Sequence, residues 1–135
     1  TRRARDLLGE QAEAWLSGRF AIVNVWRSVA GPVVTTPLAC CDASSIADGD
    51  LIASERRAAD RIGELELVAW NPAHRWYYFP QMLREEALLI KTFDTAQDGR
   101  ARRSIHTAFM NSQAPADAAP RQSLETRTLL RFQHA

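Results

Sequence analysis

Two histidines and an arginine–serine pair are the residues of this sequence best suited to catalytic or binding chemistry. His74 and His106 each stand beside a run of aromatic or β-branched residues, a composition typical of β-strands. Arg121 and Ser123 are one residue apart, so in a strand both side chains point to the same face. Histidines held on a β scaffold, with an arginine able to bind a carboxylate, suggest a metal-dependent oxygenase.

Each histidine also has a purely structural interpretation. Pro72 biases Asn71 to an extended shape, which places His74 at the entry to a strand, where a lone imidazole is more often structural than catalytic. His106 is predicted to begin a strand and to face a partly buried interior, either as a satisfied core residue or as a metal ligand. His134, next to the last residue, is predicted to be solvated.

The arginine–serine pair offers a planar guanidinium and a hydroxyl to a single carboxylate. Arginine binds carboxylates through two parallel hydrogen bonds, and Arg127 is a second candidate on the same face. The alternative for Arg121 is a surface position in a salt bridge. Other chemistries fit less well, because the sequence has no glycine-rich phosphate loop, no G-x-S-x-G motif and no nucleophile pattern around Cys40.

Length and composition are those of one ordinary globular domain. The 135 residues are enough for a hydrophobic core, and the net charge of +1 comes from interleaved basic and acidic residues. Without a basic block or a bilayer-length apolar run, neither a nucleic-acid nor a membrane partner is expected. No secretory leader is visible, and the adjacent Cys40 and Cys41 are poorly spaced for a disulfide. We therefore expect two thiols in a cytoplasmic protein.

The pattern of apolar residues predicts one helix followed by six or seven strands. Apolar residues at three- and four-residue intervals predict a helix from Leu7 to Leu16, ending near Gly18. Asp50 is predicted to cap a short helix reaching Ala59, and residues 80–86 to form a helical turn. Strands are predicted over residues 20–26, 33–39, 64–70, 75–79, 88–93, 105–110 and 123–132. This order favours an antiparallel sandwich or jelly roll.

The order of several motifs resembles the AsaB/CmcJ-like hydroxylase–desaturase family. These motifs are IVNVWR (22–27), GP (31–32), PLA (37–39) with CD (41–42), NPAHRWYY (71–78), LLIKTFD (88–94), DG (98–99), HTAF (106–109) and PRQS (120–123), followed by Glu125 and Arg127. Members of this family are regarded as non-haem Fe(II), 2-oxoglutarate-dependent oxidases of secondary metabolism. The resemblance implies a mainly β fold: a double-stranded β-helix of the jelly-roll or cupin-like type, with one N-terminal helix and short connecting helices.

The resemblance also implies roles for individual residues at a metal and co-substrate site. Family members hold iron with two histidines and one carboxylate, and His106 matches the downstream histidine ligand. Arg121 matches the arginine that binds the distal carboxylate of 2-oxoglutarate, with Ser123 beside it, and we include Arg127 in this cofactor-binding set.

The block that follows Asn71 is strongly patterned in the family. It contains His74, Arg75 and Tyr77, which we take as catalytic candidates. These three residues either line the pocket or hold the sheet together.

The family's His-x-Asp pair lies upstream of the N-terminal helix, and no His-x-Asp pair occurs in this chain. The resemblance therefore implies that two of the three iron ligands lie outside this sequence. Residues 1–135 would then be the C-terminal majority of a single oxygenase-like β domain. The expected activity is hydroxylation or desaturation of a small secondary metabolite, with a homodimer as a further expectation.

Two other hypotheses fit the same sequence. A shortened chain of this fold could be a non-catalytic β-sandwich that binds a small ligand or a partner chain at an unpaired strand edge. Alternatively, a metal site could be assembled within the chain from His74, His106 and a carboxylate such as Asp42 or Asp94.

Overall fold

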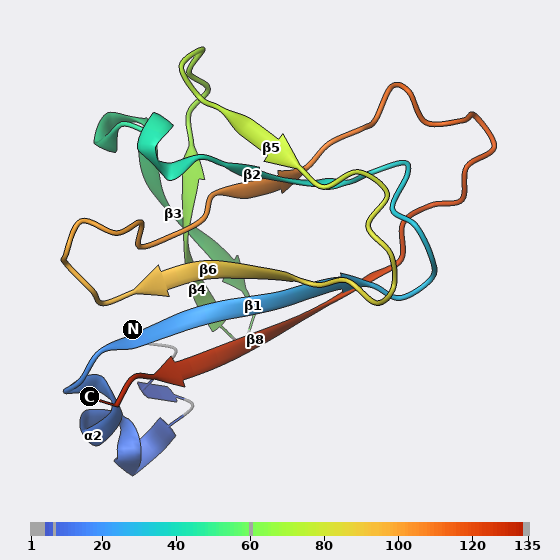
Figure 1. The fold of residues 1–135 in the computed structure, drawn as a ribbon. Helices are drawn as coiled ribbons and strands as arrows, with labels where there is room; N and C mark the ends of the chain where they lie inside the picture. The colour runs from blue at the N-terminus through green and yellow to red at the C-terminus, as the bar shows by residue number, and fades with distance from the viewer. Residues whose placement is uncertain (1–4, 7, 60, 134–135) are drawn as a thin grey trace.

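The computed structural model describes residues 5, 6, 8–59 and 61–133, and its elements are mainly β-strands (Figure 1). The helical elements are η1 (Gly9–Gln11), α2 (Ala12–Leu16), η2 (Ala43–Ser45) and η3 (Asp48–Asp50). The strands are β1 (Phe20–Ser28), β2 (Leu38–Cys41), β3 (Leu51–Ala58), β4 (Arg61–Val68), β5 (Trp76–Tyr78), β6 (Leu88–Asp94), β7 (His106–Ala108) and β8 (Ser123–Arg131).

These strands form three antiparallel sheets. The strand orders are β6-β1-β8, β5-β2-β7 and β3-β4. Figure 1 shows β2 and its neighbours running above the sheet that contains β1. A buried cluster joins these two sheets, with Trp26 from β1, Leu38 from β2 and Ile90 from β6 at its centre. The interior between the two sheets is therefore the place where inward-facing side chains of both can meet.

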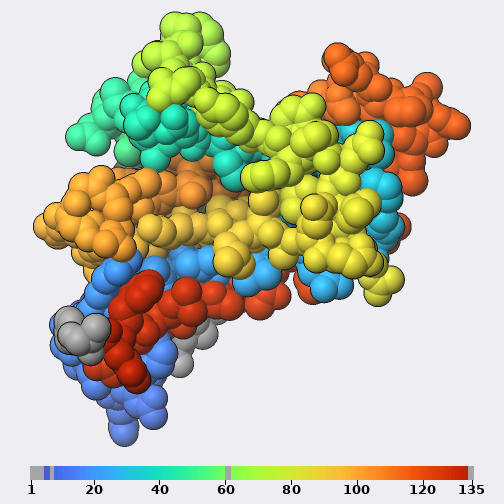
Figure 2. All heavy atoms as spheres, in the orientation of Figure 1, coloured from blue at the N-terminus to red at the C-terminus, as the bar shows by residue number. Residues whose placement is uncertain are grey.

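The two ends of the described chain lie close together. Figure 2 shows the blue N-terminal helical segment beside the red end of β8, while the orange loop after β7 projects from the opposite end. The backbone amide of Phe132 donates to the carbonyl of Arg19, and the Arg19 guanidinium lies 4.0 Å from the centre of the Phe132 ring. No helix among the described residues is long and apolar enough to cross a membrane.

Most predicted strands are confirmed, but the helix predicted from Asp50 to Ala59 is wrong. Residues 51–58 form β3, which pairs along its whole length with β4. The carboxylate of Asp50 accepts hydrogen bonds from the Asn71 side chain and from the backbone amide of Ala47, and it bonds the His74 ring. Cross-strand pairing has overridden the local helical preference.

Two smaller differences also have local causes. The helical turn predicted over residues 80–86 is a non-helical turn, because Gln81 has a φ of 52°, in the left-handed region that a helix cannot contain. The strand predicted from residue 33 begins only at Leu38. The N-terminal helix is present as η1 and α2, while Leu7, its predicted start, lies outside the described residues.

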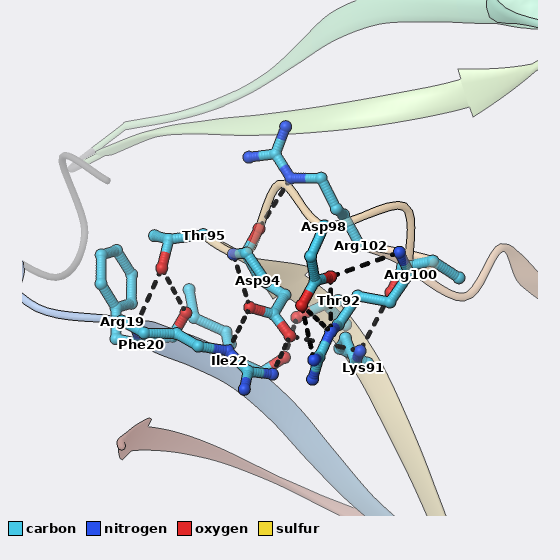
Figure 3. Close-up of polar contacts among 12 residues, drawn as sticks. Arg19, Phe20, Ile22, Lys91, Thr92, Asp94, Thr95, Asp98, Arg100 and Arg102 are labelled. Atoms are coloured by element: carbon cyan, nitrogen blue, oxygen red, sulfur yellow. Dashed lines mark hydrogen bonds and ion pairs between the residues drawn. The ribbon is translucent and has the colours of Figure 1, made fainter. Parts of the chain in front are cut away.

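A buried carboxylate fixes the end of β6 against the start of β1. Asp94 is fully buried, and its two oxygens accept hydrogen bonds of 3.2 and 2.9 Å from Arg19, as Figure 3 shows. Lys91 lies 3.2 Å from the same carboxylate, and the backbone amide of Ala96 donates to it at 2.8 Å. Hydrogen bonding from Arg19 is the main reason why the pKa of Asp94 is far below its ordinary value.

Asp94→Asn is expected to lower the free energy of unfolding by about 3 kcal/mol at neutral pH, because the two cations lose a buried partner. The lowered pKa of Asp94 means that its contribution is present above its ordinary pKa of 3.8 and is lost as pH falls through the folded-state value. Urea denaturation should therefore show a difference between wild type and variant that shrinks in acid. Asp98→Asn, in an exposed pair with Arg100, is the control and should change stability little.

Candidate functional site

The ring of His106 has one nitrogen engaged and one suited to a metal. His106 is half-buried at the start of β7, and its Nδ1 lies 2.9 Å from the carbonyl oxygen of Ser104. A carbonyl only accepts, so Nδ1 of the neutral ring carries the proton and Nε2 keeps its lone pair. Histidine ligands of metals are commonly oriented by such a bond.

Strand register places His106 on the inner side of its sheet. Leu38 belongs to the buried core between the sheets, and Cys40, two residues further along β2, shares its face. His106 pairs directly with Cys40, and Ala108 pairs with Leu38. Paired residues of an antiparallel ladder project to the same side, so the His106 ring faces the interior.

Arg121 lies in the segment just before β8 and contacts the core at the sheet that contains β1. Its guanidinium carbon lies 5.5 Å from the centre of the ring of Trp26, a core residue, and Nη1 donates to the carbonyl of Thr36 at 2.7 Å. Among the described residues no carboxylate pairs with Arg121, so the surface salt bridge that was its alternative role is not formed. A hollow of about 330 Å³ adjoins it, lined by Thr35, Thr36, Met110, Ala118 and Pro120.

Ser123 and Arg127 are both on β8, but their surroundings differ. Ser123 is exposed and pairs with Ser28 at the start of the strand. Arg127 donates from Nε to the side-chain oxygen of Asn24 at 3.1 Å, and the amide nitrogen of Asn24 donates to Glu125 at 2.7 Å. Ser123, Glu125 and Arg127 alternate along one face of β8, as the sequence predicted for the first and last of them.

Asn24 and Glu125 were not predicted as site residues from the sequence. Asn24 is 1% exposed, and burial of an amide in the middle of a strand requires hydrogen-bond partners. The one sequence signal was a polar residue interrupting the apolar run from Ile22 to Trp26. Its partners are about a hundred residues away, so no local pattern identifies them.

His74 is held by a carboxylate on the loop between β2 and β3. Its ring is 3% exposed, and Nε2 lies 3.0 Å from an oxygen of Asp50. Hydrogen bonds from Asn71, followed by the contact with His74, hold the pKa of Asp50 below its usual range. These contacts tie the β4–β5 connection to the start of β3.

Arg75 and Tyr77 flank the same region. The Arg75 guanidinium bonds Asp42 at 2.9 Å and Ser44 at 2.9 Å. Hydrogen bonding from Ser44, with Arg75 contributing, lowers the pKa of Asp42 to about 2. Tyr77 is 60% exposed. It pairs with Cys40 at one edge of β2, and His106 pairs with Cys40 at the other edge. A catalytic role for His74, Arg75 or Tyr77 stays a prediction, because the contacts described for them are with other residues of the chain.

The hypothesis of a metal centre assembled within this chain is wrong for the residues that the structure describes. They contain no group of three or more histidine, cysteine or acidic side chains that could hold a metal ion. The proposed members are separately engaged, because His74 bonds Asp50, Asp42 pairs with Arg75, and Asp94 pairs with Arg19. His134 lies outside the described residues.

The cysteines are unpaired, as predicted. Cys40 is half-buried and Cys41 is buried, and both are free thiols. Burial raises the pKa of the Cys40 thiol, which disfavours the reactive thiolate.

Comparison with known proteins identifies the family. A family model described as an oxidoreductase/YMDC permease-like domain matches residues 1–131. The hydroxylase/desaturase asaB of Aspergillus flavus is 38% identical over 137 residues, covering 91% of this chain and 60% of that protein. The chain belongs to the AsaB-like hydroxylase/desaturase family. The resemblance inferred from its motifs is thereby confirmed.

Other members of the AsaB-like family agree with this assignment. The aspirochlorine biosynthesis protein N of Aspergillus oryzae is 34% identical, covering 98% of this chain and 57% of that protein. The solved structure of the iron and alpha-ketoglutarate-dependent endoperoxidase NvfI matches with a TM-score of 0.84 at 29% identity, covering 97% of this chain and 48% of that one. The chain thus spans about half the length of the relatives it matches.

His74→Ala is expected to lower the free energy of unfolding by about 1–3 kcal/mol, because it removes a buried ring and one partner of Asp50. The pKa of Asp50 should rise toward its ordinary 3.8. Urea denaturation and carboxyl NMR titration measure the two effects. His106→Ala, at a half-buried ring, is the matched comparison and should cost less; an unchanged stability of His74→Ala would contradict the anchoring role.

Proposed function

We propose that this chain is the C-terminal majority of an Fe(II)- and 2-oxoglutarate-dependent hydroxylase or desaturase of a small metabolite. The observation that carries the proposal is that His106 and Arg121 both face the interior between the two sheets, each with a nitrogen available to a ligand. His106 presents an unprotonated Nε2 from β7, and Arg121 presents an unneutralised guanidinium beside Trp26. In this proposal residues 1–135 form one domain of the double-stranded β-helix type.

The residues present fit the iron in part. His106 would hold it through Nε2, with Ser104 fixing the orientation of the ring. The other two ligands of a two-histidine, one-carboxylate site would come from outside the described residues, because these form no further ligand cluster. When bound together with 2-oxoglutarate and dioxygen, iron supplies the oxidising power needed to remove hydrogen from an unactivated carbon.

The residues present fit 2-oxoglutarate more fully. Arg121 has one N–H bonded to the Thr36 carbonyl, which orients the guanidinium while its other N–H groups remain for a carboxylate. The Trp26 ring and the apolar cluster around it keep water from that ion pair, which strengthens it. Ser123, the first residue of β8, adds a hydroxyl two residues after Arg121.

The alternative of a non-catalytic β-sandwich is not favoured, because asaB is named a hydroxylase/desaturase and NvfI an iron and alpha-ketoglutarate-dependent endoperoxidase. A homodimer and a cytoplasmic location stay predictions. A catalytic role for His74, Arg75 and Tyr77 likewise stays a prediction.

His106→Ala is expected to reduce the iron content of the protein that carries this chain by more than tenfold, because one of the nitrogens that would bind the metal is lost. Metal analysis after anaerobic loading with Fe(II) measures this directly. His74→Gln is the matched control and should retain the iron, since that ring is bonded to Asp50. Equal iron contents in wild type and His106→Ala would contradict the proposal.

Arg121→Gln is expected to raise the Kd for 2-oxoglutarate by about 10- to 100-fold, the loss typical of a charge-assisted hydrogen-bonded pair. Isothermal titration calorimetry in the presence of Mn(II) provides the measurement. Arg84→Gln, on an exposed turn, changes net charge equally and should leave the Kd unchanged. A similar weakening in both variants would indicate only a general effect of charge.

A further inference from the structure

The Asn24 side chain separates two charged groups that would otherwise neutralise each other. Glu125 and Arg127 are two residues apart on one face of β8, where opposite charges can pair directly. In the described part of the chain they form no ion pair. The Asn24 amide lies between them instead, donating to Glu125 at 2.7 Å and accepting from Arg127 at 3.1 Å.

This arrangement leaves the outer edge of the Arg127 guanidinium available. Asn24 accepts a hydrogen bond only from Nε of Arg127. None of the residues that the structure describes bonds to Nη1 or Nη2 of Arg127. By contrast, Arg19, Arg75 and Arg100 each direct a terminal nitrogen at a carboxylate. The terminal pair of nitrogens is the edge that binds carboxylates in parallel hydrogen bonds.

The register places Arg127 and Arg121 near neighbouring positions on one face of β1. Arg127 bonds to the residue directly across from it on β1, Asn24. The Arg121 guanidinium lies against Trp26, two residues further along β1 on the same face. Two residues of strand correspond to roughly 7 Å, a separation that a short dicarboxylate can span.

We propose that Asn24 is a positioning residue, whose neutral amide keeps Arg127 unneutralised so that it binds a carboxylate between the sheets. The inference rests on the proposed function, and it extends that function by adding a second carboxylate subsite to the one at Arg121. The carboxylate is one end of a short dicarboxylate, for which 2-oxoglutarate and glutarate serve as probes. A buried asparagine is suited to this task, because its amide satisfies both neighbours without adding charge.

The test exchanges the amide and the carboxylate between two positions. The double variant Asn24→Asp with Glu125→Gln preserves shape and hydrogen bonding but sets a negative charge against Arg127. We expect its Kd for 2-oxoglutarate to rise at least tenfold, with thermal stability close to that of wild type. Glu125→Gln alone keeps the neutral spacer and removes a nearby negative charge, so it should bind 2-oxoglutarate at least as tightly as wild type. Arg127→Gln, at an exposed side chain, should weaken binding by a similar factor to the double variant.

Three probes distinguish a subsite for a second carboxylate from the results that would overturn it. Calorimetry with 2-oxoglutarate, with glutarate, and with 2-oxobutyrate, which has one carboxylate, is run on each variant. Sensitivity of 2-oxoglutarate and glutarate but not of 2-oxobutyrate supports a subsite for the co-substrate. Unchanged binding of 2-oxoglutarate and glutarate by the double variant and by Arg127→Gln overturns the positioning role. A further outcome separates this inference from the oxygenase proposal. If glutarate binding depends on Asn24 but Mn(II) does not strengthen the binding of 2-oxoglutarate, the carboxylate subsite is upheld and the oxygenase proposal is refuted. Failure of wild type to bind any probe refutes both.

Discussion

The pairing of β1 with β6 on one side and with β8 on the other is a constraint that decides which side chains lie next to each other. It aligns Asn24 with Arg127 and Trp26 with Glu125 in an unbroken register, while the β1–β6 ladder absorbs one irregularity between Ile22 and Val23. A slip of one residue would turn the inward residues to the outer face. Burial of the carboxylate of Asp94, which ties β6 to the start of β1, opposes such a slip.

The same constraint connects the fold to its chemistry. Arg127 on β8 and Arg121 just before it supply two guanidinium groups that no described carboxylate neutralises, and the facing sheet supplies an imidazole with a free nitrogen. Elsewhere in the described chain, cations such as Arg19 and Arg75 are matched with acids. Arg121, which lies against the core residue Trp26, and the exposed Arg127 can therefore both attract an anionic ligand.

The sequence predicted most of what depends on local patterns. β-branched and aromatic runs identified the strands, and the position of His106 at a strand start followed from its neighbours. Long-range contacts explain the failures. Asp50 was interpreted as a helix cap from its local surroundings, yet its carboxylate bonds Asn71 and His74, more than twenty residues away. The spacer role of Asn24 depends on β8, about a hundred residues later, and no periodicity within β1 encodes that pairing.

The most direct test of the central claim, that His106 and Arg121 face one interior, is a crystal structure of the protein with Mn(II) and 2-oxoglutarate bound under anaerobic conditions. We predict a single 2-oxoglutarate molecule between the sheets, with one carboxylate on the Arg121 guanidinium and the metal at its other end within bonding distance of His106 Nε2. A ligand bound outside this interior, or a metal held without His106, would contradict it.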